Sequence, residues 1–303
     1  MALPNPESSI TKPGPYRGRF APSPTGPLHF GSLVAALASW ARARAQNGAW
    51  IIRMEDLDPP REVSGAAADI VKTLAAFGME SDEPIMFQSA RASAYATAFG
   101  RLQRDGHVFP CWCSRSDLAA ADGLHRGACI AAPDPTRPAA WRLRVPDRVV
   151  AFDDLACGAQ AQNLAEVAGD FVVRRVEGWY AYQLAVVVDD AQQGISEVVR
   201  GADLLDSTPR QIYLQQLLGL KTPAYLHLPL VLDADGRKLS KSDRARPVER
   251  RDPAPALRAA LDFLGIDTRG ASSVAALLRA ASAQFDPKNL PKSASALPDL
   301  GTQ

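Results

Sequence analysis

Residues 19–32 read RFAPSPTGPLHFGS, and this stretch decides the fold that the sequence predicts. Residues 16–21 favour a short strand, a proline-rich turn follows, and residues 29–46 favour an amphipathic helix. A helix that begins directly after such a turn presents unpaired backbone N–H groups and a partial positive charge to an anion. Gly31 has no Cβ, so a ring or phosphate could approach the backbone, and His29 could donate to a phosphate. The stretch predicts a nucleotide site, although an ordinary strand–helix connection would also explain it.

A second motif, GRKLSKS at residues 236–242, follows the apolar run from Leu226 to Leu232. Lys238 and Lys241 lie in a loop with glycine and serine, where lysines suit pyrophosphate because they act as mobile point charges. Residues 237–251 hold seven basic and two acidic side chains, a net charge of +5, whereas the whole chain carries a formal charge of only +1. This overall charge shows that the protein as a whole is not basic. The local excess of positive charge is explained equally by a strip that binds phosphates and by a solvated surface loop.

Taken in order, HFGS at residues 29–32 and KLSKS at residues 238–242 resemble the two signature motifs of class I aminoacyl-tRNA synthetases, HIGH and KMSKS. RFAPSPTG at residues 19–26 resembles the opening of the glutamyl- and glutaminyl-type enzymes. Further blocks resemble theirs at RMEDLD (53–58), YQLAVVVDD (182–190) and VRGADLL (199–205). The resemblance covers roughly residues 16–265. It implies an α/β protein with a Rossmann-type nucleotide-binding fold, an inserted zinc-containing, acceptor-like subdomain and a short helical C-terminal region.

The resemblance also implies the substrate sites. Arg19, Tyr182 and Arg200 would hold the side-chain carboxylate of L-glutamate, and Glu55 its α-ammonium group. Two guanidinium groups and a phenol suit a carboxylate, because arginine is a fork-shaped donor and tyrosine a neutral one. Surface ion pairs for the arginines and a solvated turn for Glu55 are the alternatives. The full sets are Arg19, Phe20, Ala21, Pro22, Ser23, Glu55, Tyr182 and Arg200 for glutamate, His29, Gly31, Ser32 and Lys241 for ATP, and His29, Lys238 and Lys241 for catalysis.

Three of the four cysteines cluster with a histidine. Cys111, Cys113, His125 and Cys129 form the pattern C-x-C-x11-H-x3-C, and three thiolates with one imidazole are a normal tetrahedral zinc set. Four protein ligands predict one structural Zn²⁺ per chain, and unconnected thiols are the alternative. Related enzymes carry zinc at this place, often with tyrosine as the third ligand, where this sequence has His125. Cys157 is expected to be a small buried side chain.

The expected domain organisation combines these motifs with hydrophobic periodicity. It comprises a disordered leader (1–15), the first Rossmann half (16–107), an inserted zinc-containing subdomain (108–165), the second Rossmann half with the KLSKS loop (166–242), a helical stem-contact-like region (243–290) and a disordered tail (291–303). Within it we expect helices at 64–77, 91–105, 208–218, 253–264 and 272–282, and strands at 49–54, 171–175, 179–189, 194–200 and 225–232. His107 and His227 are expected to be ordinary strand or core residues.

No apolar run approaches the roughly 18 residues needed to span a membrane, and the first fifteen residues have no apolar core typical of a signal peptide. We therefore expect a cytoplasmic monomer with no membrane partner. Of the 303 residues, 61 follow Ser242. A glutamyl-tRNA synthetase continues there with regions that contact the tRNA stem and read the anticodon, which 61 residues could not build.

The chain therefore resembles the shorter branch of the family, the glutamyl-Q tRNA(Asp) synthetases. That resemblance implies ATP-dependent, tRNA-independent activation of L-glutamate as glutamyl-adenylate, with Mg²⁺ accompanying ATP, and transfer of glutamate to the queuosine of tRNA(Asp). Two alternatives stay open. One is a short glutamyl-tRNA synthetase that charges a tRNA 3′ end, and the other is a catalytically silent RNA-binding relative.

Overall fold

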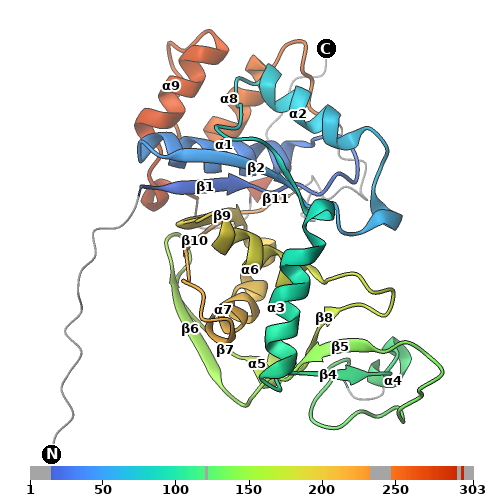
Figure 1. Cartoon of the computed structure of the whole chain (residues 1–303). Coiled ribbons are helices and arrows are strands. Elements are labelled where there is room, and N and C mark those ends of the chain that lie inside the picture. Colours follow the sequence, from blue (N-terminus) through green and yellow to red (C-terminus); the bar gives the residue numbers. More distant parts are fainter. Residues whose placement is uncertain (1–14, 120–121, 233–246, 292–294, 297–303) are drawn as a thin grey trace, which may run out of the picture.

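The computed structural model describes residues 15–119, 122–232, 247–291 and 295–296 (Figure 1). Its first part alternates strands and helices: β1 (Arg17–Phe20), α1 (Phe30–Ala45), β2 (Ala49–Met54), α2 (Ala66–Ala76), β3 (Met86–Phe87) and α3 (Ala92–Arg104). Its middle part comprises β4 (Val108–Cys111), α4 (Arg115–Ala119), β5 (Ala140–Leu143), β6 (Val149–Asp154), β7 (Gly158–Asn163), α5 (Leu164–Val167) and β8 (Phe171–Arg174). Its last part comprises α6 (Tyr182–Gln192), β9 (Glu197–Gly201), α7 (Thr208–Leu217), β10 (Ala224–Leu228), β11 (Val231–Leu232), α8 (Ala254–Phe263), α9 (Val274–Gln284) and β12 (Ser295–Ala296).

Two sheets meet at the middle of the molecule. β1, β2 and β3 are parallel, and the second sheet has the order β7-β6-β10-β9, in which only β7 runs antiparallel to its neighbour. The backbone N–H of Ser196, just before β9, donates to the Arg17 carbonyl of β1 at 3.0 Å, so β9 lies beside β1. Parallel strands joined through helices are the pattern of a Rossmann-type fold. The predicted α/β class is confirmed.

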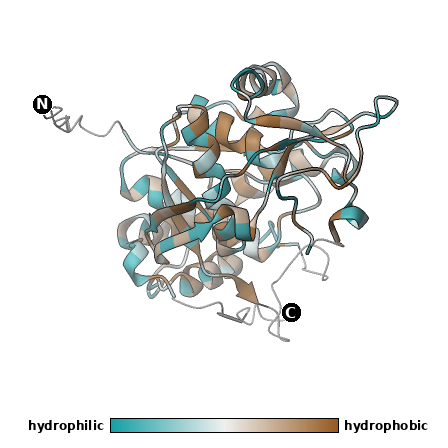
Figure 2. Cartoon of the chain, turned by 90° about the horizontal axis from the view of Figure 1, so that it is seen from below, coloured by the Kyte–Doolittle hydropathy of each residue, from teal (hydrophilic) through white to brown (hydrophobic). Residues whose placement is uncertain are grey.

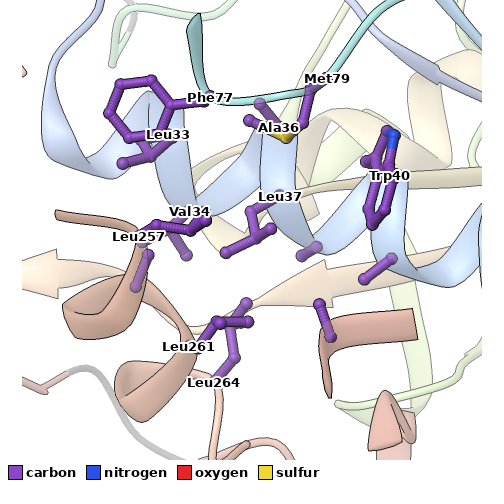
Figure 3. Close-up of a cluster of buried hydrophobic side chains, with 14 of the residues drawn as sticks. Leu33, Val34, Ala36, Leu37, Trp40, Phe77, Met79, Leu257, Leu261 and Leu264 are labelled. Carbon is purple, nitrogen blue, oxygen red and sulfur yellow. The ribbon is translucent and has the colours of Figure 1, made fainter. Parts of the chain in front are cut away.

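Helix α1 is the centre of the larger core. His29 is its N-cap and accepts a hydrogen bond from the Ser32 N–H. In the last turn, the positive charges of Arg42 and Arg44 interact favourably with the negative end of the helix dipole. Figure 3 shows α1 side chains facing leucines from the α8 region on one side and Phe77 and Met79 on the other. Leu33 and Leu37 are fully buried there, and each contributes roughly 1.5–3 kcal/mol by leaving water.

Figure 2 shows helices that carry hydrophobic and hydrophilic residues side by side. Predicted helices 64–77, 91–105, 208–218, 253–264 and 272–282 are confirmed as α2, α3, α7, α8 and α9, and predicted strands 49–54, 171–175 and 194–200 as β2, β8 and β9.

Two sequence-based predictions of secondary structure are wrong. Residues 179–189 were expected to form a strand, but Tyr182–Gln192 is helix α6. Its valine-rich run from Leu184 to Val188 is buried throughout, and such a run has no polar face whose period distinguishes helix from strand. The expected strand 225–232 is split into β10 and β11 around Pro229, because proline has no N–H to donate to a sheet.

A third, antiparallel sheet of β4, β5 and β8 carries the cysteine-rich segment. The hairpin of β6 and β7, by contrast, joins β10 in the second sheet, with Tyr225 paired to Asp154. The domain boundaries stay predictions, and the leader at 1–14 and residues 297–303 lie outside the described residues. Within the described ranges, no helix is both long and apolar enough to cross a bilayer.

Candidate functional site

A cavity of about 720 Å³ opens where β1, β2, β9 and β10 end. Ligands of open α/β sheets bind at the carboxyl ends of strands. Its lining includes every sequence-predicted substrate residue that the structure describes: Arg19, Phe20, Ala21, Pro22, Ser23, His29, Gly31, Ser32, Glu55, Tyr182 and Arg200. Lys238 and Lys241 lie outside the described residues. Side chains separated by up to about 180 positions in sequence are thus brought around one hollow.

Arg19 is held by a carboxylate that the sequence did not assign to the site. Its Nε donates to Oδ1 of Asp190 at 3.1 Å, and the same oxygen accepts from Nη2 of Arg53 at 2.8 Å. Arg53 and Arg19 are 0 % and 3 % exposed. Burial alone would raise the pKa of Asp190, but the two guanidinium groups outweigh it and hold that pKa below its usual range. Asp190, from α6, therefore fixes two arginines at the ends of β1 and β2.

Glu55 follows the last residue of β2 and is anchored through its backbone, whose N–H donates to the Pro22 carbonyl at 2.9 Å. Its side chain is one-tenth exposed, and Oε1 lies 3.5 Å from Nη2 of Arg53 while accepting no hydrogen bond from a described residue. Burial raises the pKa of Glu55 to about 7, against the attraction of Arg53 and Arg19. A buried carboxylate short of donors is prepared to accept a cation, such as an ammonium group.

Tyr182 begins α6 and faces Arg200 from β9. Nη1 of Arg200 lies 3.4 Å from the Tyr182 hydroxyl, and Nη2 donates to Oγ1 of Thr208 at 2.8 Å. Burial raises the pKa of Tyr182, so the phenol stays protonated near neutral pH. Arg200 and Tyr182 together offer a cationic and a neutral donor to an anion in the cavity.

His29 and Ser32 lie at the first turn of α1. His29 Nε2 and Ser32 Oγ are 3.0 Å apart, and Nδ1 accepts from the Ser32 N–H at 3.3 Å. His29 also forms a backbone bridge with Pro247, the first described residue after position 232. The predicted start of the helix is confirmed, and it presents a helix N-terminus to the cavity, where an anion is favoured.

The cavity rim carries charges that the sequence analysis missed. Arg61 pairs with Asp58 at 2.6 Å, and Arg175 lies 3.5 Å from the same carboxylate and over the ring of Trp179. The guanidinium groups stay partly exposed, and such groups can contact the phosphates of a nucleic acid. Asp58 closes the block RMEDLD, but nothing in the sequence connected that block to Arg175.

The predicted metal ligands come together on the third sheet. One ligand atom from each of Cys111, Cys113, His125 and Cys129 lies within 4.8 Å of the others. Nδ1 of His125 lies 2.9 Å from Oδ2 of Asp170, and its Nε2 is buried with no hydrogen-bond partner among the described residues. A histidine that is oriented by a carboxylate and keeps its other nitrogen available is typical of metal sites. The cluster can therefore hold a metal ion such as zinc.

Two further residues complete the description of this region. Gly169 has a φ of +58°, and a Cβ there would lie 2.5 Å from the His125 carbonyl oxygen. Glycine therefore lets the backbone just before Asp170 approach His125. Cys157 was expected to be buried but is exposed, because it lies in the tight turn between β6 and β7.

Comparison with known proteins identifies the family. The model described as "tRNA synthetases class I (E and Q), catalytic domain" matches residues 16–137 and 131–297. The chain belongs to this class I tRNA synthetase family. A glutamyl-Q tRNA(Asp) synthetase of Burkholderia cenocepacia is 59% identical over 267 residues, which covers 84% of this chain and 90% of that protein. One of Xanthomonas campestris is 56% identical over 285 residues, which covers 93% and 95%.

Two solved structures have a fold similar to that of this chain. A glutamate tRNA ligase of Elizabethkingia meningosepticum, crystallised in complex with its amino acid, has a TM-score of 0.80 at 23% identity, covering 94% of this chain and 67% of that one. The glutamate-tRNA synthetase of Elizabethkingia anophelis has a TM-score of 0.79 at 24% identity, covering 93% and 68%. The predicted class I synthetase fold is thereby confirmed. At these identities the likeness concerns the fold alone.

Proposed function

We propose that this chain is an ATP-dependent ligase that activates L-glutamate without tRNA and transfers it to the queuosine of tRNA(Asp). The observation that carries the proposal is the identity of 56–59% with glutamyl-Q tRNA(Asp) synthetases over most of both chains. The cavity supports it independently, because its donors and the carboxylate of Glu55 suit an amino acid with a second carboxyl group.

In the first step, the α-carboxylate of glutamate attacks the α-phosphorus of ATP, forming glutamyl-adenylate and releasing pyrophosphate. Glu55 pairs with the α-ammonium group, and Arg19, Tyr182 and Arg200 hold the side-chain carboxylate. His29 and the N–H groups at the start of α1 stabilise charge on the phosphates. Lys238 and Lys241, from the motif outside the described residues, would hold the pyrophosphate, and Mg²⁺ accompanies the nucleotide.

Glutamine is excluded by the same donors. The guanidinium groups of Arg19 and Arg200 donate hydrogen bonds and accept none. A carboxylate offers acceptors to both, whereas the NH₂ of an amide would face donors and leave buried groups unpaired.

In the second step, a hydroxyl of the queuosine cyclopentene ring attacks the carbonyl carbon of the adenylate, with release of AMP and a proton. The exposed guanidinium groups of Arg61 and Arg175 at the rim support the approach of an RNA by contacting phosphates. We further propose that Cys111, Cys113, His125 and Cys129 hold one structural Zn²⁺, and that the protein acts as a cytoplasmic monomer.

ATP–pyrophosphate exchange with L-glutamate, measured without tRNA, tests the first step. Labelled glutamate, offered with tRNA(Asp) that contains or lacks queuosine, tests the second. We expect exchange without tRNA and transfer only to the queuosine form, with the label still transferred when the 3′-terminal adenosine of the tRNA has been removed before the reaction. Exchange that depends on tRNA(Glu), or transfer that removal of the 3′-terminal adenosine prevents, would instead indicate an enzyme that charges a 3′ end.

A further inference from the structure

Arg200 is held through a histidine instead of a carboxylate. Its Nε donates to Nε2 of His227 at 3.1 Å, and Nδ1 of His227 lies 2.7 Å from Oδ2 of Asp154. Asp154, His227 and Arg200 are only 4 %, 1 % and 6 % exposed. None of the ion pairs among the described residues includes Arg200. A buried positive charge thus reaches the cavity, and no carboxylate from the part of the chain that the structure describes is bonded to it.

The geometry determines which nitrogen of His227 carries the proton. Arginine only donates hydrogen bonds, so Nε2 of His227 must be the acceptor from Arg200, and Nδ1 carries the proton that is donated to Asp154. The other oxygen of Asp154 accepts the N–H groups of Ala156 and Cys157 at 3.0 and 2.8 Å. Those bonds prevent the carboxylate from rotating away, because both of its oxygens are engaged.

Further contacts hold Arg200 on the sides away from the cavity. Nη2 donates to Thr208, and the guanidinium carbon lies 5.5 Å from the centre of the Tyr225 ring, which stacks on His227. Nη1 is left beside the Tyr182 hydroxyl, in the lining of the cavity. The network therefore aims one end of the guanidinium at the cavity.

We infer that Asp154 and His227 are positioning residues that orient Arg200 for the substrate's side-chain carboxylate without neutralising its charge. The inference rests on the proposed function. A carboxylate bonded directly to Arg200 would compete with the substrate for its donors and repel it. A neutral imidazole accepts from Nε but carries no charge, and it keeps the Asp154 carboxylate one ring farther away. Arg19, which pairs directly with Asp190, shows the opposite arrangement.

Two substitutions of His227 distinguish the hydrogen bond that its ring accepts from Arg200 from the one that it donates to Asp154. In His227→Gln, the longer side chain places a carbonyl oxygen near the position of Nε2, where it can accept from Arg200. In His227→Asn, the amide reaches only the position of Nδ1, so the acceptor for Arg200 is lost. Asp154→Asn keeps the shape of the side chain but replaces one oxygen by an NH₂. In one orientation this NH₂ faces the N–H groups of Ala156 and Cys157. In the other it faces Nδ1 of His227 and forces the imidazole proton onto Nε2. His107→Asn and the exposed Asp153→Asn are matched controls.

The measurement is ATP–pyrophosphate exchange as a function of glutamate and, separately, of ATP. We expect His227→Asn and Asp154→Asn to raise the KM for glutamate by about tenfold or more, the loss of one charge-assisted hydrogen bond, with the KM for ATP unchanged. His227→Gln should stay within about threefold of wild type, as should both controls. Equal KM values for the Gln and Asn variants, or a parallel rise in the KM for ATP, would overturn the inference.

A spectroscopic test does not depend on activity or on how the variants fold. The ¹⁵N shifts of the wild-type His227 ring should report a neutral imidazole protonated at Nδ1, and a ring protonated at Nε2 or at both nitrogens would overturn the inference. Absence of exchange in the wild-type protein would refute the proposed function instead, and the ring shifts would still decide the geometry. Thermal unfolding without ligand identifies any variant whose KM reflects misfolding.

Discussion

Lowering the pH should weaken glutamate binding through Glu55. Its pKa of about 7 means that the carboxylate is half protonated at neutral pH in the empty site, and a protonated carboxyl cannot pair with an ammonium group. Binding must then release the proton. If the bound pKa lies well below 5.5, the dissociation constant rises about tenfold for each pH unit below 7, which gives about a 30-fold weaker affinity at pH 5.5 than at pH 8.5.

Isothermal titration calorimetry in buffers of different ionisation enthalpy measures both effects. We expect release of about half a proton per glutamate bound at pH 7, and almost none at pH 8.5. Glu55→Gln should bind glutamate weakly at every pH and abolish both the proton release and the slope. Affinity that is independent of pH from 5.5 to 8.5 in the wild-type protein would refute the proposed role of Glu55.

The same group affects the stability of the empty protein, and the sign is opposite to that of an ordinary surface carboxylate. Because the folded pKa of Glu55 is raised from 4.5 to about 7, the folded state binds the proton more tightly than the unfolded state. Its favourable contribution is complete below pH 4.5 and is lost as the pH rises through 7. The full change is about 3 kcal/mol from this residue, and the difference between wild type and Glu55→Gln in urea unfolding at pH 5 and 8 isolates it.

Three further predictions concern the framework of the site. Asp190→Asn removes the carboxylate to which both Arg19 and Arg53 are bonded and should lower the free energy of unfolding by about 3–5 kcal/mol in urea. Glu83→Gln, at an exposed pair with Arg17, should change it little, and equal effects of the two substitutions would contradict the network. Elemental analysis should find one zinc per chain, and a chelator should remove it with a fall in Tm; a metal-free protein of unchanged Tm would contradict the structural role. Gly169→Ala should release that zinc more readily than wild type does, because its Cβ pushes against the His125 carbonyl, and identical release rates would contradict the contact.

The sequence predicts those features of this structure that depend on residues close together in the chain better than those that depend on distant residues. The β1–α1–β2 unit was predicted well, because its proline-rich turn and hydrophobic period are local features within about 40 residues. Helix α6 was predicted as a strand, because its interior positions are apolar on all sides and only the packing decides their conformation.

The candidate site was predicted in its members but not in its connections. The resemblance named Arg19 and Arg200, and the structure brings both to one cavity. It gave no sign of Asp190, 171 positions from Arg19, or of Asp154, 73 positions from His227. An isolated aspartate or histidine gives no indication of its partner. His227 is a buried strand residue, as expected, but it is also bonded to Arg200, which the sequence did not indicate.

The two arginines of the proposed glutamate site therefore differ in electrical state. Arg19 shares a carboxylate with Arg53, so that one negative charge from Asp190 partly compensates both guanidinium groups before any ligand arrives. Arg200 is also buried, but among the described residues it is connected to a carboxylate only through a neutral ring. An incoming carboxylate gains more from an uncompensated guanidinium than from a paired one, because a bonded carboxylate both occupies donors and repels the ligand. Arg200 should consequently account for most of the attraction of the substrate's side-chain carboxylate, while Arg19 mainly fixes its position.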